Sequence, residues 1–175
     1  MTSISIQSLA ADELDAHADR LAGIMAQTVE DGAAIGFMQP FSAADALAFL
    51  AGQVFPEVRA GRRKLLIAHL DGQTVGSVQL ILALPPNQPH RCEVAKMMVS
   101  PQARRKGVGR ALMRAVVDEA RAAGKTLVTL DTRTGDKAEP LYRAAGFETA
   151  GVIPGFARDP DGRALHATTY MYKTV

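Results

Sequence analysis

The sequence predicts one mixed α/β domain over residues 1–175, with a twisted mixed sheet and helices on both faces. A strand, a helix and a second strand follow one another between residues 91 and 131, an order typical of parallel neighbours. Two apolar runs on either side of Asp71-Gly72 predict an antiparallel hairpin. Hydrophobic residues make up 47% of the 175 positions, enough to bury one core. The predicted sheet therefore combines parallel and antiparallel pairing.

The N-terminal part predicts a short strand at residues 4–9 and then two helices. Apolar residues recur with helical spacing over residues 12–30. Ser42 is a suitable N-cap for the second helix. We expect that helix to run to about Phe55, where Pro56 would stop or kink it.

The remaining elements are apolar runs bounded by turn residues. Asp71-Gly72 supplies the left-handed backbone that a tight hairpin turn needs. Gly124 and Gly146 follow two helical patterns as C-terminal caps. The predicted strands are 64–70, 74–84, 91–100, 126–131 and one around 166–173, and the predicted helices are 107–123 and 138–145.

Charge and cysteine content narrow the class of function. Twenty basic residues stand against 18 acidic ones and form no long run, so nucleic acid is not expected as the main partner. The single cysteine, Cys92, excludes an internal disulfide and fits a reducing compartment. No secretion signal and no stretch of membrane-spanning length is visible. We therefore expect a cytoplasmic protein without a membrane partner.

The segment Arg104-Arg105-Lys106-Gly107-Val108-Gly109, followed by Arg110, predicts an anion site at the start of a helix. Free backbone N–H groups and the helix dipole attract phosphate oxygens, and glycines allow their close approach. A Walker-type loop is absent, and a dinucleotide fold would need a third glycine. A phosphorylated ligand is the prediction.

Three motifs at fixed spacing indicate which phosphorylated ligand is expected. A strand ends in Met97-Met98-Val99-Ser100-Pro101, Arg-x-x-Gly-x-Gly then opens a helix at Arg104, and Leu141-Tyr142-Arg143-Ala144-Ala145-Gly146-Phe147 follows a further strand. Together they resemble the GNAT superfamily of acyl-CoA-dependent N-acyltransferases, and the resemblance covers the whole chain.

The resemblance implies the GNAT fold and acetyl-CoA as cosubstrate. Backbone N–H groups from Arg105 to Arg110 would hold the diphosphate, and residues 97–99 (Met97, Met98 and Val99) would run beside the pantetheine arm on a bulged, splayed strand. Many superfamily members place an asparagine seven residues before the helix tyrosine. Here that position is Gly135, which puts one cofactor contact in doubt.

A narrower resemblance concerns the acceptor. The segments 32–38, 130–132, 151–156, 159–162 and 166–169 resemble the tabtoxin-resistance acetyltransferase branch, whose members acetylate an amine on a small toxin. A primary amine of a small molecule is what this resemblance implies, with an amino-acid-like compound, a toxin or an antibiotic as the candidate acceptors. Two other functions stay open, a protein or peptide N-acetyltransferase with an open groove and a non-catalytic acyl-CoA sensor. A homodimer is possible.

Three side chains are the candidate catalytic residues. Tyr142 is the candidate acid for the departing thiolate, since a thiol pKa near ~8.5 and a phenol pKa near ~10 lie close enough for a hydrogen bond or proton transfer to help. Glu93 and Asp131 are candidate bases for an acceptor that arrives as ammonium. For Glu93 a salt-bridged strand carboxylate is an equal alternative.

No metal is expected to take part. The four histidines, His17, His69, His90 and His166, have no metal-ligand spacing, although His166 could line the substrate pocket. Cys92 is interpreted as a packing thiol. Without a covalent nucleophile, we expect direct transfer in a ternary complex, with backbone N–H groups near Met97 or Met98 stabilising the oxyanion.

Overall fold

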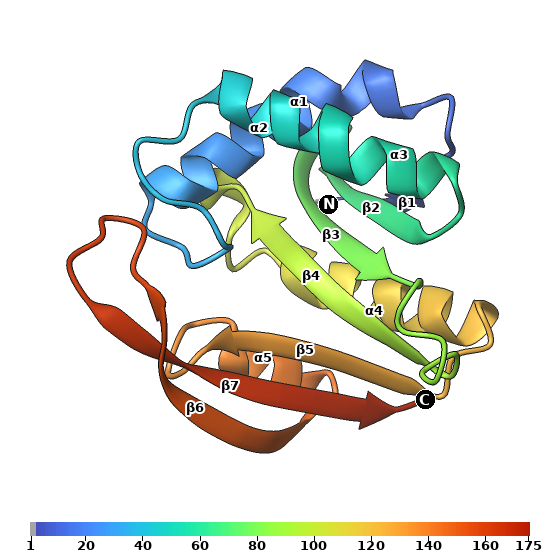
Figure 1. The fold of residues 1–175 in the computed structure, drawn as a ribbon. Helices are drawn as coiled ribbons and strands as arrows, with labels where there is room; N and C mark the ends of the chain where they lie inside the picture. Colours follow the sequence, from blue (N-terminus) through green and yellow to red (C-terminus); the bar gives the residue numbers. More distant parts are fainter. Residues whose placement is uncertain (1–2) are drawn as a thin grey trace.

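The computed structural model describes residues 3–175, and seven strands form one sheet in the order β1-β2-β3-β4-β5-β7-β6 (Figure 1). The strands are β1 (Ile4–Ser8), β2 (Arg63–Leu70), β3 (Gln73–Ile81), β4 (Arg91–Val99), β5 (Leu127–Arg133), β6 (Glu148–Arg158) and β7 (Leu165–Thr174). The helices are α1 (Leu14–Glu30), α2 (Ala43–Phe49), α3 (Phe55–Arg59), α4 (Val108–Ala122) and α5 (Glu139–Ala144).

The sheet is mixed, as predicted. Strands β1 to β4 pair antiparallel in chain order, β4 and β5 are parallel, and β7 pairs antiparallel with both β5 and β6. Helix α4 makes the crossover between the two parallel strands. In the β2–β3 hairpin, Asp71 and Gly72 have φ of 50° and 80°, the left-handed turn that the Asp-Gly pair predicts.

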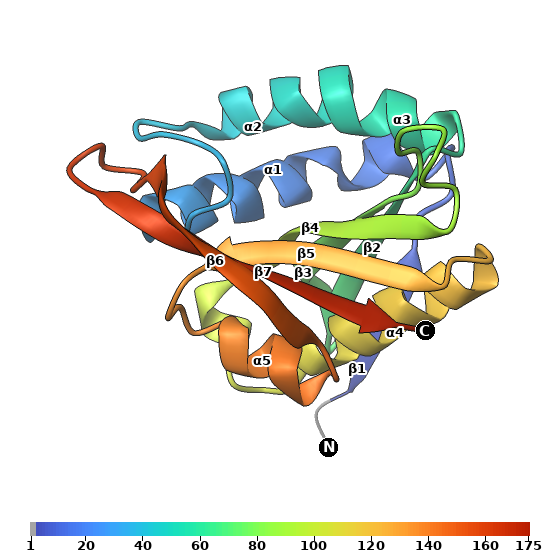
Figure 2. The same cartoon turned by 60° about the horizontal axis from the view of Figure 1, so that its bottom comes forward.

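Helices cover both faces of the sheet (Figure 2). One core lies under α4, whose buried side chains Val108, Leu112 and Val116 recur at helical spacing and pack on β2 to β5. The other core lies between the sheet and α1, α2 and α3, where Leu21 and Phe55 pack on the opposite side of β2. Strands β2 and β3 are consequently buried on both faces.

Pro56 does not stop the helix, which was one of the two effects expected of it. Ser42 caps α2 as predicted, with a capping box to Asp45, but the chain stays helical through Pro56 as far as Arg59. A five-residue π-helical turn, Leu50–Val54, precedes the proline. Proline then stands in the first turn of α3, where its missing N–H costs nothing, and the wider turn relieves its clash with the preceding carbonyls.

Strand β6 was not predicted as a separate element. Every residue from Glu148 to Phe156 is exposed, and Gly151, Pro154 and Gly155 interrupt the pattern. Without a buried face, this strand has no alternation of apolar and polar residues to reveal it. Strand β3 also ends at Ile81 rather than at residue 84.

Two further expectations concern membrane-spanning helices and the domain boundaries. Within residues 3–175 we find no helix with both the length and the apolar character that a bilayer crossing needs. The boundaries of the single domain, 1–175, stay a prediction.

Candidate active site

The parallel strands β4 and β5 separate after three residues. Residues 91–93 pair with residues 127–129, and no later residue of β4 pairs with β5 in the described part of the chain. From Val94 to Val99, the edge of β4 that faces β5 therefore has no partner strand. An extended ligand with its own amide groups can add to such an edge.

A bulge in β4 lies at the opening of this split. The ladder between β3 and β4 shifts register between Ser77 and Gln79, which leaves Lys96 and Met97 opposite a single residue of β3. Lys96 has a left-handed φ of 50°. A bulge bends its strand and redirects its side chains. The bulged and splayed strand implied by the sequence resemblance is thus present.

The segment 104–110 joins β4 to α4 and exposes backbone donors. Arg105 and Gly107 have φ of 60° and 88°. Among residues 3–175, no group accepts a hydrogen bond from the backbone N–H groups of residues 105–110. Unpaired N–H groups around left-handed residues, at the positive end of a 15-residue helix, form a concavity suited to phosphate oxygens.

The cations of this segment differ in their surroundings. Arg104 Nη2 lies 2.9 Å from Asp31 Oδ2, and Arg104 Nε donates to the Val99 carbonyl at 3.2 Å, so that side chain fastens the segment to the end of α1. Arg105, Lys106 and Arg110 are exposed. Their charges are available to an anion at the helix start.

Gly109 sets how closely α5 approaches α4. A Cβ atom at Gly109 would lie 2.9 Å from Leu141 Cδ2. The glycine therefore lets the helix that carries Tyr142 pack beside the anion-binding segment.

Tyr142 on α5 is buried and lines the same cleft as β4. Its ring lies edge-on to Phe147, with centroids 6.4 Å apart. Burial, reinforced by the negative charges of Asp136 and Asp131, raises the pKa of the phenol well above its ordinary value. Tyr142 consequently keeps its proton at neutral pH, and its hydroxyl can donate a hydrogen bond.

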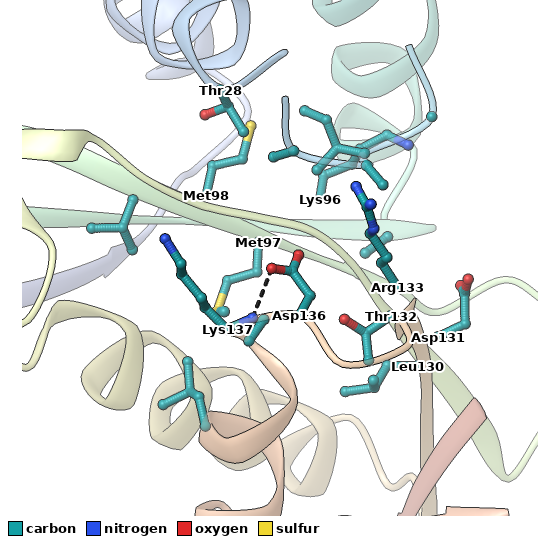
Figure 3. Close-up of a pocket in the computed structure, with 18 of the residues that line it drawn as sticks. Thr28, Lys96, Met97, Met98, Leu130, Asp131, Thr132, Arg133, Asp136 and Lys137 are labelled. Atoms are coloured by element: carbon teal, nitrogen blue, oxygen red, sulfur yellow. Dashed lines mark hydrogen bonds between the residues drawn. The ribbon is translucent and has the colours of Figure 1, made fainter. Parts of the chain in front are cut away.

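Glu93 and Asp131 line one cleft of about 1140 Å³, although they come from different strands. Glu93 Oε2 lies 3.4 Å from Arg91 Nη1, a partly exposed ion pair. Asp131 Oδ2 accepts a hydrogen bond from Thr168 Oγ1 at 2.9 Å. Figure 3 shows Asp131 and Met97 on the two strands that border the split. The structure thus brings together both predicted carboxylates.

Lys96 and Arg133 are two of four cleft cations, with Lys137 and Arg158, that were not predicted from the sequence. Arg133 follows Asp131 by two residues on β5, so strand alternation places both side chains on one face, a signal that was available. Lys96 stands at the β4 bulge, which sequence periodicity does not show. Arg133 Nη1 pairs with Asp159 Oδ1 at 2.7 Å. Figure 3 shows Lys96 and Arg133 reaching toward the same part of the cleft.

Two loops meet at the end of the cleft lined by Phe37, Met38, Phe156, Arg158 and His166, here called the hairpin end. The Gln39 N–H donates to the Pro160 carbonyl at 2.8 Å. Figures 1 and 2 show the α1–α2 loop beside the β6–β7 turn. This contact ties the α1–α2 loop to the β6–β7 hairpin.

The other polar candidates have simpler surroundings. Cys92 is fully buried, and burial raises the pKa of its thiol to about 11, which fits a packing role. His166 lines the cleft, and its buried Nε2 has no partner among the described residues. Residues 3–175 contain no group of three or more His, Cys, Asp or Glu side chains arranged to hold a metal ion.

The fold and site define an α/β protein in which a split parallel pair leads to a helix start with unpaired backbone N–H groups. The acetyltransferase (GNAT) family model matches residues 36–147. The chain belongs to the acetyltransferase (GNAT) family.

Some known proteins are similar to this chain in sequence, and others are similar in fold. An uncharacterized N-acetyltransferase of the hisH-hisA intergenic region in Azospirillum brasilense is 38% identical over 80 residues, covering 45% of this chain and 48% of that protein. The match therefore spans about half of the relative's length. Two solved structures share the fold. A ribosomal-protein-alanine N-acetyltransferase from Brucella melitensis has a TM-score of 0.78 at 22% identity, covering 98% and 99% of the two chains. The yncA protein of Salmonella typhimurium, solved with its cofactor acetyl-CoA, has a TM-score of 0.78 at 18% identity, covering 98% and 94%.

Proposed function

We propose that this chain is an N-acetyltransferase that moves an acetyl group from acetyl-CoA to the primary amine of a small molecule. The observation that carries the proposal is the split between β4 and β5, which leads from the unpaired N–H groups of residues 105–110 to Tyr142 and two carboxylates. Family membership supports the donor. The tabtoxin-resistance branch stays a narrower hypothesis.

We assign two parts of acetyl-CoA, the diphosphate and the pantetheine arm, to residues of this chain. Residues 104–110 would bind the diphosphate, and the free edge of residues 97–99 would hydrogen-bond the pantetheine amides. When bound, acetyl-CoA supplies the thioester carbonyl that the amine attacks. The backbone N–H groups near Met97 and Met98 are the donors that we assign to the developing negative charge on its oxygen.

Two proton transfers are assigned to side chains. Asp131, assisted by Glu93, attracts the ammonium form of the acceptor and takes its proton directly or through water. Tyr142, held neutral by burial, donates a hydrogen bond to the leaving thiolate, while its raised pKa disfavours full transfer of the proton. We propose direct transfer in a ternary complex, with no covalent acetyl-enzyme. The single cysteine, Cys92, does not line the cleft.

The tied loops favour a small acceptor over a protein chain. The bond from Gln39 to Pro160 joins the two loops beside the hairpin end, and we expect this to restrict the entry of an extended peptide there. The ribosomal-protein-alanine N-acetyltransferase among the structural relatives shares the fold at only 22% identity, so it carries no argument for a protein acceptor. Association of two copies and a cytoplasmic location stay predictions, and the assigned roles need one chain only.

The test measures free thiol released from acetyl-CoA with a panel of small amines and with peptides that have a free N-terminus. We expect release with at least one small amine and an acetylated product by mass spectrometry. Release only with peptides would favour the protein acetyltransferase. Binding of acetyl-CoA without any turnover would favour the sensor.

A further inference from the structure

Lys96 occupies an unusual position in the cleft. Three non-glycine residues in the described chain have a left-handed φ, and Lys96 alone stands inside a strand. The other two lie in turns. Such a backbone costs on the order of 1–3 kcal/mol and persists where the surroundings require it, often at functional sites. The bulge directs the Lys96 side chain to the α1–α2 loop, where Nζ lies 5.2 Å from the Phe37 ring centroid and 5.9 Å from that of Phe49.

The α1–α2 loop is shaped around this ammonium group. Gly36 has a φ of 89°, and a Cβ atom there would lie 3.1 Å from Lys96 Nζ. A side chain at Gly36 would therefore crowd the cation. The glycine keeps open the space beside Nζ.

The positive charge of Lys96 has no counter-ion in the described residues. No carboxylate lies within 4.0 Å of its Nζ, whereas the neighbouring Arg133 is paired with Asp159 and Arg91 with Glu93. Burial and the charge of Arg63 lower the pKa of Lys96, and Asp131 partly opposes them. Contacts with two aromatic rings offset only part of the cost of a desolvated cation. The cleft therefore holds a lysine that is in no direct ion pair with its carboxylates.

We infer that the acceptor carries a carboxylate beside its amine, and that Lys96 binds this carboxylate. The inference rests on the proposed function and narrows its substrate class to amino acids and their analogues. Asp131 and Glu93 then receive the ammonium end of a zwitterion, and Lys96 receives the anionic end, from strands that border one cleft. The paired Arg133 adds positive potential nearby (Figure 3).

A structural role predicts different behaviour. If Lys96 only anchors the α1–α2 loop through Phe37 and Phe49, its loss should affect every acceptor equally. A carboxylate-binding role affects only acceptors that have the anion. The comparison therefore uses free L-amino acids, including lysine and ornithine, each beside its own carboxamide. The carboxamide keeps the amines and the shape of the amino acid, but a neutral amide group replaces the carboxylate.

The experiment measures kcat/KM for both members of each pair with saturating acetyl-CoA, in the wild-type enzyme and in Lys96→Met, Lys96→Arg and Lys64→Met. Lys64 pairs with Glu119 and does not line the cleft, so Lys64→Met removes one positive charge elsewhere. We expect the wild type to prefer the amino acids. Lys96→Met should lose roughly 10- to 100-fold on the amino acids and little on the carboxamides, because a hydrogen bond to a charged group is lost only there. Lys96→Arg should retain part of the preference, and Lys64→Met should match the wild type.

The outcomes separate the two proposals. Turnover of carboxamides or plain amines without preference for the free amino acids, or an equal loss on both members of each pair in Lys96→Met, overturns the inference and leaves the proposed function intact. Absence of turnover with every amine overturns the proposed function itself. If Lys96→Met does not fold, the wild-type preference between amino acid and carboxamide decides the inference alone.

Discussion

Glu93 pairs with Thr129, and this is the last contact in the parallel ladder between β4 and β5. Beyond it the two strands diverge, with the β4 bulge on one side of the opening and Asp131 on the other. The first candidate base therefore stands at the apex of the split and the second along its wall. The predictions below follow from this arrangement.

Replacing Tyr142 with Phe should lower kcat roughly 100-fold while acetyl-CoA binds as before, since the substitution removes a proton donor and keeps the ring packed on Phe147. Steady-state kinetics and calorimetric titration measure the two effects. Tyr172→Phe, on β7 outside the cleft, is the matched control. An unchanged kcat in Tyr142→Phe would remove the tyrosine from the mechanism.

A comparison of the wild type with Tyr142→Phe also tests the pKa of the Tyr142 phenol. Burial first, then Asp136 and Asp131, hold the pKa of Tyr142 above its ordinary value. The absorbance of tyrosinate should therefore show a late ionisation step in the wild type at high pH. That step should be missing in Tyr142→Phe, and its persistence there would assign it to another group.

Asp131→Asn should lower kcat/KM more than Glu93→Gln does, because Glu93 shares its charge with Arg91 whereas Asp131 is held by a neutral Thr168 hydroxyl. Steady-state kinetics of the two variants measure both losses. Asp118→Asn on α4, which pairs with Arg121, is the control, and a larger loss in Glu93→Gln would exchange the two roles.

Gly107→Ala should weaken acetyl-CoA binding. Its φ of 88° forces a side chain into a left-handed conformation at a cost of about 1–2 kcal/mol, and relief of that strain would turn the N–H groups away from the anion. Gly124 has a φ of 70° at the other end of α4. Gly124→Ala should destabilise the fold to a similar degree without changing the Kd for acetyl-CoA. Equal Kd values in both variants would contradict an anion site at residues 104–110.

Cys92 should contribute to stability only up to moderately alkaline pH. Burial raises its pKa to about 11, against about 8.5 in an unfolded chain. The folded protein keeps the proton, so this contribution is complete below about pH 8.5 and is lost as the pH rises toward 11. Urea unfolding at pH 8 and 10 should show a decline smaller in Cys92→Ala than in the wild type, on the order of 1–2 kcal/mol. Equal declines would show that the thiol is not buried.

Local signals explain what the sequence could predict. Helix α4 has a strong apolar stripe, the Asp71-Gly72 turn has a backbone requirement that few residues meet, and the order of β4, α4 and β5 implies a parallel pair. These features depend on residues close in the chain. The predicted positions of Glu93 and Asp131 in one cleft follow from the same order, whereas Tyr142 was predicted from the resemblance of its motif to the GNAT superfamily.

Features that depend on pairing between residues far apart in the sequence could not be predicted. The bulge at Lys96 exists only in the register between β4 and β3, and the lack of a direct ion pair for Lys96 is evident only from the three-dimensional contacts. The bond from Gln39 to Pro160 joins residues more than a hundred positions apart. Strand β6 is exposed and pairs only with β7, so nothing in its own sequence distinguishes it from a loop.

The central claim is direct acetyl transfer from acetyl-CoA in the split to an amine. Its most direct test is a matrix of initial rates in which acetyl-CoA and a turned-over amine are both varied. The account predicts double-reciprocal lines that intersect, with one acetylated amine formed for each CoA released. Parallel lines would indicate a covalent acetyl-enzyme, and either that pattern or CoA release without acetylated amine would contradict the claim.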